Sequence, residues 1–180
     1  PEYSRQSRLM PYFHGLIVQP DCHLCPLRWD RKVFPDGPIP AKMAIVGEGP
    51  GKTEVRLGKG FVGPSGLLLW RLGKPGGLER ENVWVSNATL CFPRDVMLST
   101  GVLLRKEQVI KIAAEACRRR LIGELLCVSQ GNPNFVVQPL GNISMRSLSP
   151  HRKNMKIFSY RGSVMNIDLQ ALWNEVNLGR

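Results

Sequence analysis

The chain has 180 residues, of which 43% are hydrophobic, so it is long enough to bury a sizeable core as one domain, residues 1–180. Its 25 Lys and Arg against 14 Asp and Glu give a net charge of +11, which favours a nucleic-acid partner because neutralising phosphates releases their counterions; a merely soluble basic protein is the alternative. The sequence has neither an apolar run long enough to span a membrane nor a signal peptide's apolar segment, which argues against membrane and secreted classes, and we expect a soluble protein of the cytoplasm.

The first motif along the chain is a Cys-x-x-Cys pair, Cys22 and Cys25, in the segment DCHLCPL. With five cysteines and no secretory signal, we expect reduced thiols rather than a disulfide framework. The spacing lets two sulfurs turn onto one metal ion or cluster, and zinc, redox and iron–sulfur proteins all use it. Two more ligands are then needed: Cys91 follows a predicted strand and Cys117 lies on a predicted helix, whereas the apolar neighbours of Cys127 favour a core thiol.

A short apolar strand is predicted at 43–47, and the loop GEGPGKT follows it. A P-loop requires a glycine, four residues, and then Gly-Lys-Ser/Thr. Counting back from Gly51 and Lys52 places Val46 where the first glycine belongs, so the loop is one residue too short to be a P-loop. It must therefore serve another purpose.

The other predicted elements alternate between helices and strands. They are helices at 63–73 and 106–127, strands at 83–88 and 135–141, and a short amphipathic helix in the tail at 163–180. Ser65 is expected to cap the first helix, and Arg118–Arg120 to lie on or near the exposed side of the second. This alternation predicts an α/β fold with a doubly wound parallel sheet, whose ligand site lies beyond the carboxyl ends of the strands.

Five segments of the chain carry a resemblance to a known family: CHLCPL, GPIPAKMAIVGEGPGKTEVRLGKGFVGPSG, VWVSNATLCFPRD, EACRRRL and NFVVQPLG. In that order they resemble the family-4 uracil-DNA glycosylases, over 22–162, and Asn87 stands four residues before Cys91 as the family pattern requires. The resemblance implies a three-layer α/β/α fold with a central, mostly parallel sheet. It also implies a four-iron four-sulfur (4Fe-4S) cluster on Cys22, Cys25, Cys91 and Cys117. The activity it implies is excision of uracil from single- or double-stranded DNA in base excision repair, and we expect a monomer.

Three side chains suit the chemistry of such an enzyme, and each has a plainer alternative. The Asn87 amide can both donate to and accept from uracil, a pattern that cytosine reverses; the alternative is a turn residue at a strand end. The ring of Phe61 can stack on a flipped base, unless it is ordinary core. Glu48 can position a water or oppose charge on the sugar, unless it is a solvated loop charge, with Glu54 as a weaker competitor.

The backbone of the same loop is expected to contribute as well. Gly47 and Gly49 let the main chain approach the substrate and offer N–H donors to a uracil oxygen. Ser65, with the start of its helix, is expected to bind a DNA phosphate, although capping alone would explain the same serine.

Three departures from the family pattern bear on activity. Gly60 stands where the family has a proline, and 92–116 is longer than the family's segment between its third and fourth cysteines. The family's C-terminal His-Pro-Ser motif does not follow Arg161–Gly162, and His151 precedes that segment, so it does not inherit the role. The chain is then a divergent active enzyme, a DNA-binding or protein-interaction homologue with a structural cluster, or a fragment. A small zinc-binding nucleic-acid protein is a further alternative.

Overall fold

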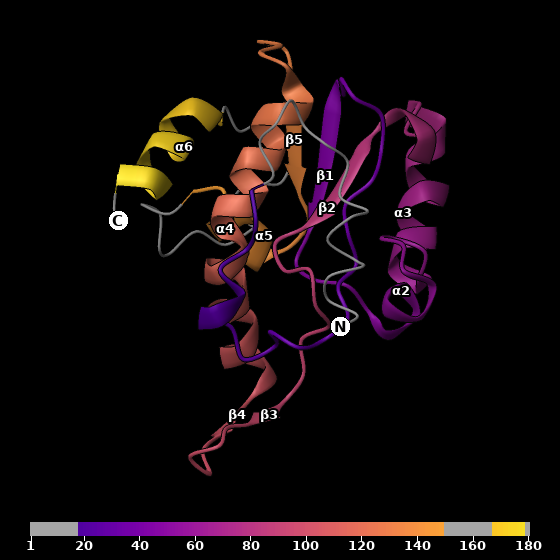
Figure 1. Cartoon of the computed structure of the whole chain (residues 1–180). Coiled ribbons are helices and arrows are strands. Elements are labelled where there is room, and N and C mark those ends of the chain that lie inside the picture. The colour runs from indigo at the N-terminus through magenta and orange to yellow at the C-terminus, as the bar shows by residue number, and fades with distance from the viewer. Residues whose placement is uncertain (1–17, 150–166, 179–180) are drawn as a thin grey trace.

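The computed structural model describes residues 18–149 and 167–178 (Figure 1). The sequence-based expectations for His151 and for Arg161–Gly162 lie outside the described residues. The expectation of one domain over 1–180 stays a prediction.

Three parallel strands form the central sheet. Its order is β2-β1-β5, with bounds of Met43–Gly47 for β1, Trp84–Asn87 for β2 and Val136–Pro139 for β5. All three strands were predicted, and both strand pairs are parallel, as expected. Every residue of β2 and all but the first of β1 are buried. Burial explains the continuous apolar run of β1, whereas β2 ends in two buried polar residues, Ser86 and Asn87.

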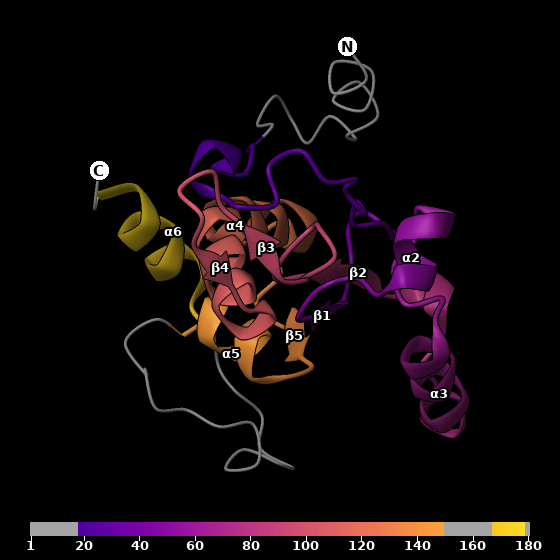
Figure 2. The same cartoon turned by 90° about the horizontal axis from the view of Figure 1, so that it is seen from below.

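Helices cover the sheet on both sides and give three layers (Figures 1 and 2). On one side lie α2, Lys52–Leu57, and α3, Pro64–Gly73; on the other lie α4, Lys106–Ser129, and α5, Asn142–Ser147, with α6, Leu169–Leu178, packed on the outside of α4. The three-layer α/β/α fold is therefore confirmed, as are the predicted helices and the helical tail.

The two faces of the sheet supply two separate parts of the core. Ala44 and Val46 of β1 pack in a cluster with Leu121 and Leu125 of α4. Ile45, between them in sequence, belongs to a cluster on the opposite face, which includes Leu69 and Trp70 of α3. The alternation follows from the two-residue period of a strand, and it places α3 and α4 on opposite sides of β1.

The long segment between Cys91 and Cys117 folds as a hairpin and the first half of α4. The hairpin pairs β3, Val96–Met97, with β4, Leu103–Leu104, and it projects from the body of the protein (Figure 1). Short 3-10 turns complete the description: η2, Cys22–Leu24, η3, Lys74–Gly76, and η4, Arg80–Asn82. None of the described helices is both long and apolar enough to cross a membrane.

Two local expectations were wrong. The N-cap of α3 is Gly63, with Pro64 first in the helix, so Ser65 is an exposed residue of the first turn and no cap. The extended backbone of Gly63 and the fixed φ of the proline begin the helix without a side-chain cap. Arg118 and Arg120 are buried, at 8% and 2% exposure, because each finds hydrogen-bond acceptors inside the protein.

Candidate active site

A cavity of ≈ 390 Å³ opens at the carboxyl ends of the strands. The chain leaves β1 for α2 and α3 on one side of the sheet, and it reaches β5, on the other side of β1, through α4. This change of direction creates the crevice where open α/β sheets bind ligands. The cavity is lined by all the residues predicted for catalysis and substrate binding, namely Gly47, Glu48, Gly49, Phe61, Ser65 and Asn87.

The side chains of Asn87 and Phe61 both lie against Gly47 inside this cavity. Gly47 and Asn87 are register partners at the ends of β1 and β2. A Cβ atom on Gly47 would overlap Asn87 Oδ1 and lie 2.9 Å from Phe61 Cζ. The Asn87 side chain is therefore held against a bare stretch of backbone, with the aromatic ring beside it.

The loop that carries Phe61 is fixed by contacts with α3. Phe61 has φ of +57°, an unusual conformation for a residue with a side chain. The Trp70 indole Nε1 donates a hydrogen bond of 2.9 Å to the Phe61 carbonyl oxygen, and the two ring centroids lie 6.2 Å apart. A Cβ on Gly66 would overlap the Phe61 backbone, so the glycine permits this close approach. At Gly60, where the sequence departs from the family pattern, the structure has room for a side chain, since an added Cβ atom would lie 3.6 Å from Val85 Cγ1.

The two carboxylates of the cavity have different contacts. Glu48 Oε1 accepts a hydrogen bond of 3.0 Å from the Ile143 backbone N–H at the start of α5, and its side chain lies against Gly141. Glu54 Oε1 accepts one of 2.8 Å from the Gly63 backbone N–H. Glu54 therefore fastens the loop before α3, whereas Glu48 joins the β1 loop to α5.

The four cysteines predicted as ligands lie in one region of the fold, where η2, the segment after β2 and α4 meet. Asp21 N donates to the Ala116 carbonyl oxygen at 2.8 Å, which ties η2, with Cys22, to the helix that carries Cys117. Cys25 and Cys91 pack on the same apolar cluster.

Burial raises the pKa of the Cys91 thiol to about 12 and that of Cys25 to about 11. Burial is the main cause of both shifts, and the neighbouring thiols Cys117 and Cys22 contribute to them. Over residues 18–149 and 167–178, however, no three His, Cys, Asp or Glu side chains are placed so as to hold a metal ion.

Cys127 differs from these four thiols. It is half-buried and packs against the cluster between the sheet and α4. The expectation of a structural core thiol agrees with this position.

Arg120 is the main residue of the site that sequence reasoning missed. Its guanidinium donates to the Asn87 carbonyl oxygen at 2.8 Å and pairs with the Glu124 carboxylate at 2.6 Å. Burial lowers the pKa of Arg120, but the Glu124 charge, with a smaller contribution from Cys117, outweighs burial and raises it, so the guanidinium stays charged. The only sequence signal was Glu124, four residues further along the helix.

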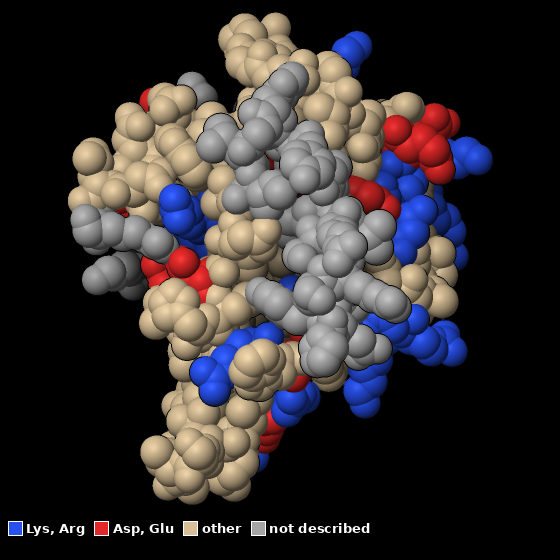
Figure 3. Space-filling model, viewed as in Figure 1, with Lys and Arg blue, Asp and Glu red and all other residues tan. Residues whose placement is uncertain are grey.

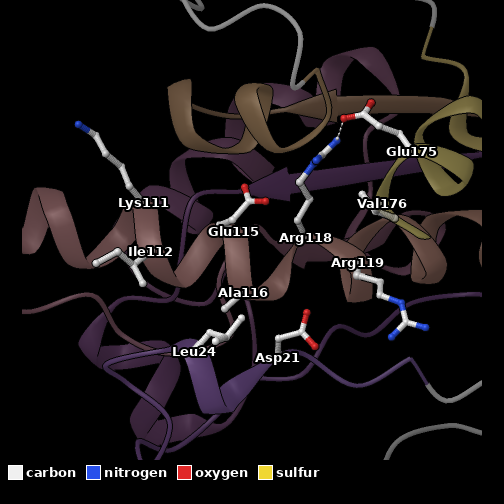
Figure 4. A pocket seen from close by; sticks show the side chains of 10 residues that line it. All are labelled: Asp21, Leu24, Lys111, Ile112, Glu115, Ala116, Arg118, Arg119, Glu175 and Val176. Atoms are coloured by element: carbon white, nitrogen blue, oxygen red, sulfur yellow. Dashed lines mark hydrogen bonds and ion pairs between the residues drawn. The ribbon is translucent and has the colours of Figure 1, made fainter. Parts of the chain in front are cut away.

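A second cavity, of ≈ 650 Å³, lies between η2, α4 and α6 (Figure 4). It contains none of the predicted site residues. Its lining carries both charges: Lys111, Arg118 and Arg119 against Asp21, Glu115 and Glu175. Arg118 points to Glu175, at 3.3 Å, so part of this charge is neutralised within the protein.

Comparisons with known proteins agree with this geometry. A family model described as Uracil DNA glycosylase superfamily matches residues 34–173. The chain is 39% identical over 144 residues to the Type-4 uracil-DNA glycosylase of Thermotoga maritima, covering 79% of this chain and 67% of that protein. It is 42% identical over 94 residues to the protein of the same name from Archaeoglobus fulgidus, covering 48% of this chain and 47% of the relative.

The match to the protein of that name from Pyrobaculum aerophilum has 38% identity over 82 residues, with 44% of this chain and 41% of the relative covered. The matched part is thus about two thirds of the Thermotoga protein and less than half of the other two. The family model spans most of the chain and includes all three strands of the sheet and the residues of the first cavity. The chain therefore belongs to the uracil DNA glycosylase superfamily.

Proposed function

We propose that this chain is a uracil-DNA glycosylase of DNA repair, which hydrolyses the bond between uracil and deoxyribose. The observation that carries the proposal is the shared cavity in which the Asn87 amide, the Phe61 ring and the Glu48 carboxylate lie together. Its volume of ≈ 390 Å³ suits a base that has been rotated out of the duplex.

Asn87 and Phe61 recognise the base. The Asn87 amide donates to uracil O4 and accepts from N3–H, and the matching groups of cytosine have the opposite polarity. The Phe61 ring provides a stacking face, and such base–aromatic contacts are worth about 1–3 kcal/mol. The absence of a side chain at Gly47 leaves room for both groups to meet the base.

Glu48 and the loop backbone act on the scission step. As the C–N bond breaks, positive charge develops on the sugar and negative charge on uracil. The hydrogen bond from Ile143 N fixes the orientation of the Glu48 carboxylate, which aligns the attacking water or opposes the charge on the sugar. Gly47 and Gly49 present backbone N–H groups to the uracil oxygen that gains charge.

A face rich in Lys and Arg supports DNA as the partner. Figure 3 shows these residues gathered on the side that carries α2 and α3. The exposed members in these elements and the segments that follow them are Lys52, Arg56, Lys59, Arg71 and Lys74. Lys52 also lines the cavity, so phosphates flanking a flipped base would meet positive charge. Exposed Ser65, at the start of α3 and in the lining, is placed to donate to one of them.

We also propose that Cys22, Cys25, Cys91 and Cys117 hold a 4Fe-4S cluster. The donor set fits the group, because iron–sulfur clusters are bound by four thiolates, and Cys22 and Cys117 lie near enough to Cys25 and Cys91 to raise the pKa of those two thiols. When bound, the cluster would link η2, the segment after β2, and α4 as a structural brace. The chemistry of uracil excision takes place in the cavity, on this chain's own residues.

The test is single-turnover cleavage of a labelled single-stranded oligonucleotide with one uracil, followed by alkali to open abasic sites. Protein purified without oxygen should cleave at the uracil. Asn87→Ala should reduce the rate by about 10²-fold or more, since a buried hydrogen-bonding partner of the base is lost. Asn82→Ala is the matched control, because Asn82 is exposed and its side-chain amide donates to a surface carboxylate, that of Glu79.

Cleavage that is lost with Asn87→Ala and kept with Asn82→Ala supports the proposal. Wild-type protein that binds the oligonucleotide but leaves it intact overturns the enzymatic function. It would leave a DNA-binding homologue, for which affinity should fall steeply with salt and be indifferent to uracil.

A further inference from the structure

Arg120 is buried at the point where the strand that carries Asn87 ends. It lies on α4 at 2% exposure, facing the sheet. One guanidinium nitrogen, Nη1, donates to Ser86 Oγ at 3.1 Å and to Glu124 Oε2 at 2.6 Å. The other, Nη2, donates to the carbonyl oxygens of Asn87 at 2.8 Å and Ala88 at 3.4 Å.

Glu124 completes the buried network and ties it to the start of the same strand. Its second oxygen, Oε1, accepts a hydrogen bond of 2.6 Å from Trp84 Nε1. Trp84 and Asn87 are the first and last residues of β2. The Arg120–Glu124 pair therefore holds β2 at both ends, although both residues lie more than thirty positions further along the chain.

The opposite side of the same segment is held by β1. Ala88 N donates to the Gly47 carbonyl oxygen at 2.8 Å, and Thr89 N to that of Glu48 at 3.0 Å. The N–H groups after Asn87 thus bond to the catalytic loop, while Arg120 holds the carbonyl groups. Because the backbone at Asn87 is held from both sides, the direction in which its side chain enters the cavity is fixed.

We propose that Arg120, held by Glu124, is a positioning residue that fixes the Asn87 amide for base recognition. The inference rests on the proposed function and adds to it a residue that touches neither base nor sugar. Its physical basis is that misplacing a recognition group by about 1 Å can cost about 10²-fold in rate. A positively charged donor holds its carbonyl acceptors more firmly than a neutral one, which suits this task.

The double replacement of a buried ion pair can distinguish a positioning role from a structural one, because folding does not require the pair to be charged. A buried pair can be replaced by apolar residues of similar size with little loss of stability, whereas removing one partner leaves an unpaired charge. The informative variant is therefore the double replacement Arg120→Met with Glu124→Leu. Arg118→Met is the matched control. Arg118 is on the same helix, is also buried, and also donates to a backbone carbonyl oxygen, that of Ser147, but it does not line the cavity that contains Asn87.

Two measurements are made on each cluster-containing protein: the single-turnover rate, and the binding preference for an oligonucleotide with 2′-fluoro-deoxyuridine over one with 2′-fluoro-deoxycytidine. The fluorine blocks cleavage, so binding is measured without turnover. The double variant should lose about 10²-fold in rate and most of its preference, while melting temperature and iron content stay near wild type. Arg118→Met should keep both the rate and the preference.

Arg120→Lys keeps the buried charge and serves if the double variant does not fold. A single ammonium cannot reach Ser86, Glu124 and two carbonyls with the geometry of a guanidinium, so an intermediate rate and preference are expected. Wild-type rate and preference in either variant would overturn the proposal, as would an equal loss in Arg118→Met.

The same measurements distinguish failure of the proposed function from failure of the proposed role of Arg120. If the wild-type protein prefers uracil but does not cleave, only the catalytic activity is overturned, and the role of Arg120 is decided by the binding preference. If the wild-type protein neither cleaves nor prefers uracil, the proposed function and the role of Arg120 are both overturned.

Discussion

Gly47 and Asn87 face each other at the ends of β1 and β2, and the space of a Gly47 side chain is filled by Asn87 Oδ1. Phe61 Cζ lies against the same space, 2.9 Å from the position that a Cβ atom on Gly47 would take. The backbone of Gly47 is that of an ordinary strand, so its conformation does not require glycine. What requires glycine is the close approach of two side chains, Asn87 and Phe61, which we propose to recognise the base.

Gly47→Ala is therefore expected to disable the site while leaving the fold intact. The added methyl group must displace the Asn87 amide or the Phe61 ring, and the single-turnover rate on uracil DNA should fall by about 10²-fold or more. The melting temperature should change by only a few degrees, since one methyl group at the rim of the core is involved.

Gly76→Ala is the control for this substitution, because a Cβ there meets no atom within 4 Å. It should cleave at the wild-type rate. Full activity in Gly47→Ala would mean that Asn87 does not work from the position in which it lies.

Trp70→Phe is expected to weaken substrate binding by releasing Phe61. The substitution keeps an aromatic ring on α3 but removes the indole N–H that donates to the Phe61 carbonyl oxygen. The loop then loses a hydrogen bond worth about 0.5–1.5 kcal/mol, and Phe61 can leave its unusual φ of +57°. The dissociation constant for uracil DNA should rise severalfold more than the maximal rate falls.

Trp29→Phe provides the comparison, since Trp29 is 80% exposed. In Trp29→Phe, the dissociation constant for uracil DNA and the maximal rate should both stay at wild-type values. If Trp70→Phe behaves like Trp29→Phe, the carbonyl contact does not hold the stacking ring in place.

The strands and the larger helices could be predicted because their signals are local. Runs such as 43–47 are short, apolar and bounded by turn residues, and helix 106–127 repeats its apolar residues with a period near 3.6. That Glu48 and Asn87 line one cavity could be predicted because the carboxyl ends of parallel strands meet at one edge of the sheet.

The contacts that depend on distant partners could not be predicted. Three consecutive arginines on an amphipathic helix indicate a solvated face, since a buried charge is costly without a partner. The acceptors of Arg120 on Ser86 and Asn87 become visible only after α4 has packed on β2. Trp70 and Phe61 are likewise joined through a main-chain carbonyl, which no side-chain pattern reveals.

The four proposed ligands should be separable from the fifth cysteine by iron content. Cys91→Ala should reduce iron from about four atoms per chain to a small fraction and remove the visible absorption, because a three-thiolate site holds the cluster poorly. Cys127→Ala is the matched control, since it packs against another part of the core and should keep iron and colour. Iron lost from Cys127→Ala but kept in Cys91→Ala would contradict the ligand set, and zinc in place of iron would contradict the cluster.

Asp95 offers a test of the segment that lengthens the chain between the third and fourth proposed ligands. Its Oδ1 accepts a hydrogen bond of 2.7 Å from the Lys106 backbone N–H at the start of α4, and its Oδ2 accepts one of 2.9 Å from Arg105. The hydrogen bond from Arg105, followed by that from Lys106, lowers the pKa of Asp95 below its ordinary value of 3.8. Because the folded-state pKa is the lower one, the stabilisation is present above the unfolded value and is lost as pH falls through the folded value.

Asp95→Asn should therefore lower the melting temperature at pH 7, by a few degrees, and the difference from wild type should close as the pH falls below 3.8. Comparing the two proteins at each pH cancels the acid loss of any cluster, which both share.

Glu107→Gln is the control, because Glu107 is an exposed carboxylate in the first turn of the same helix. The gap at pH 7 should also narrow with salt, since the Arg105 pair is exposed to solvent. A gap that does not narrow as the pH falls below 3.8 would show that Asp95 acts through the shape of its side chain rather than through its charge.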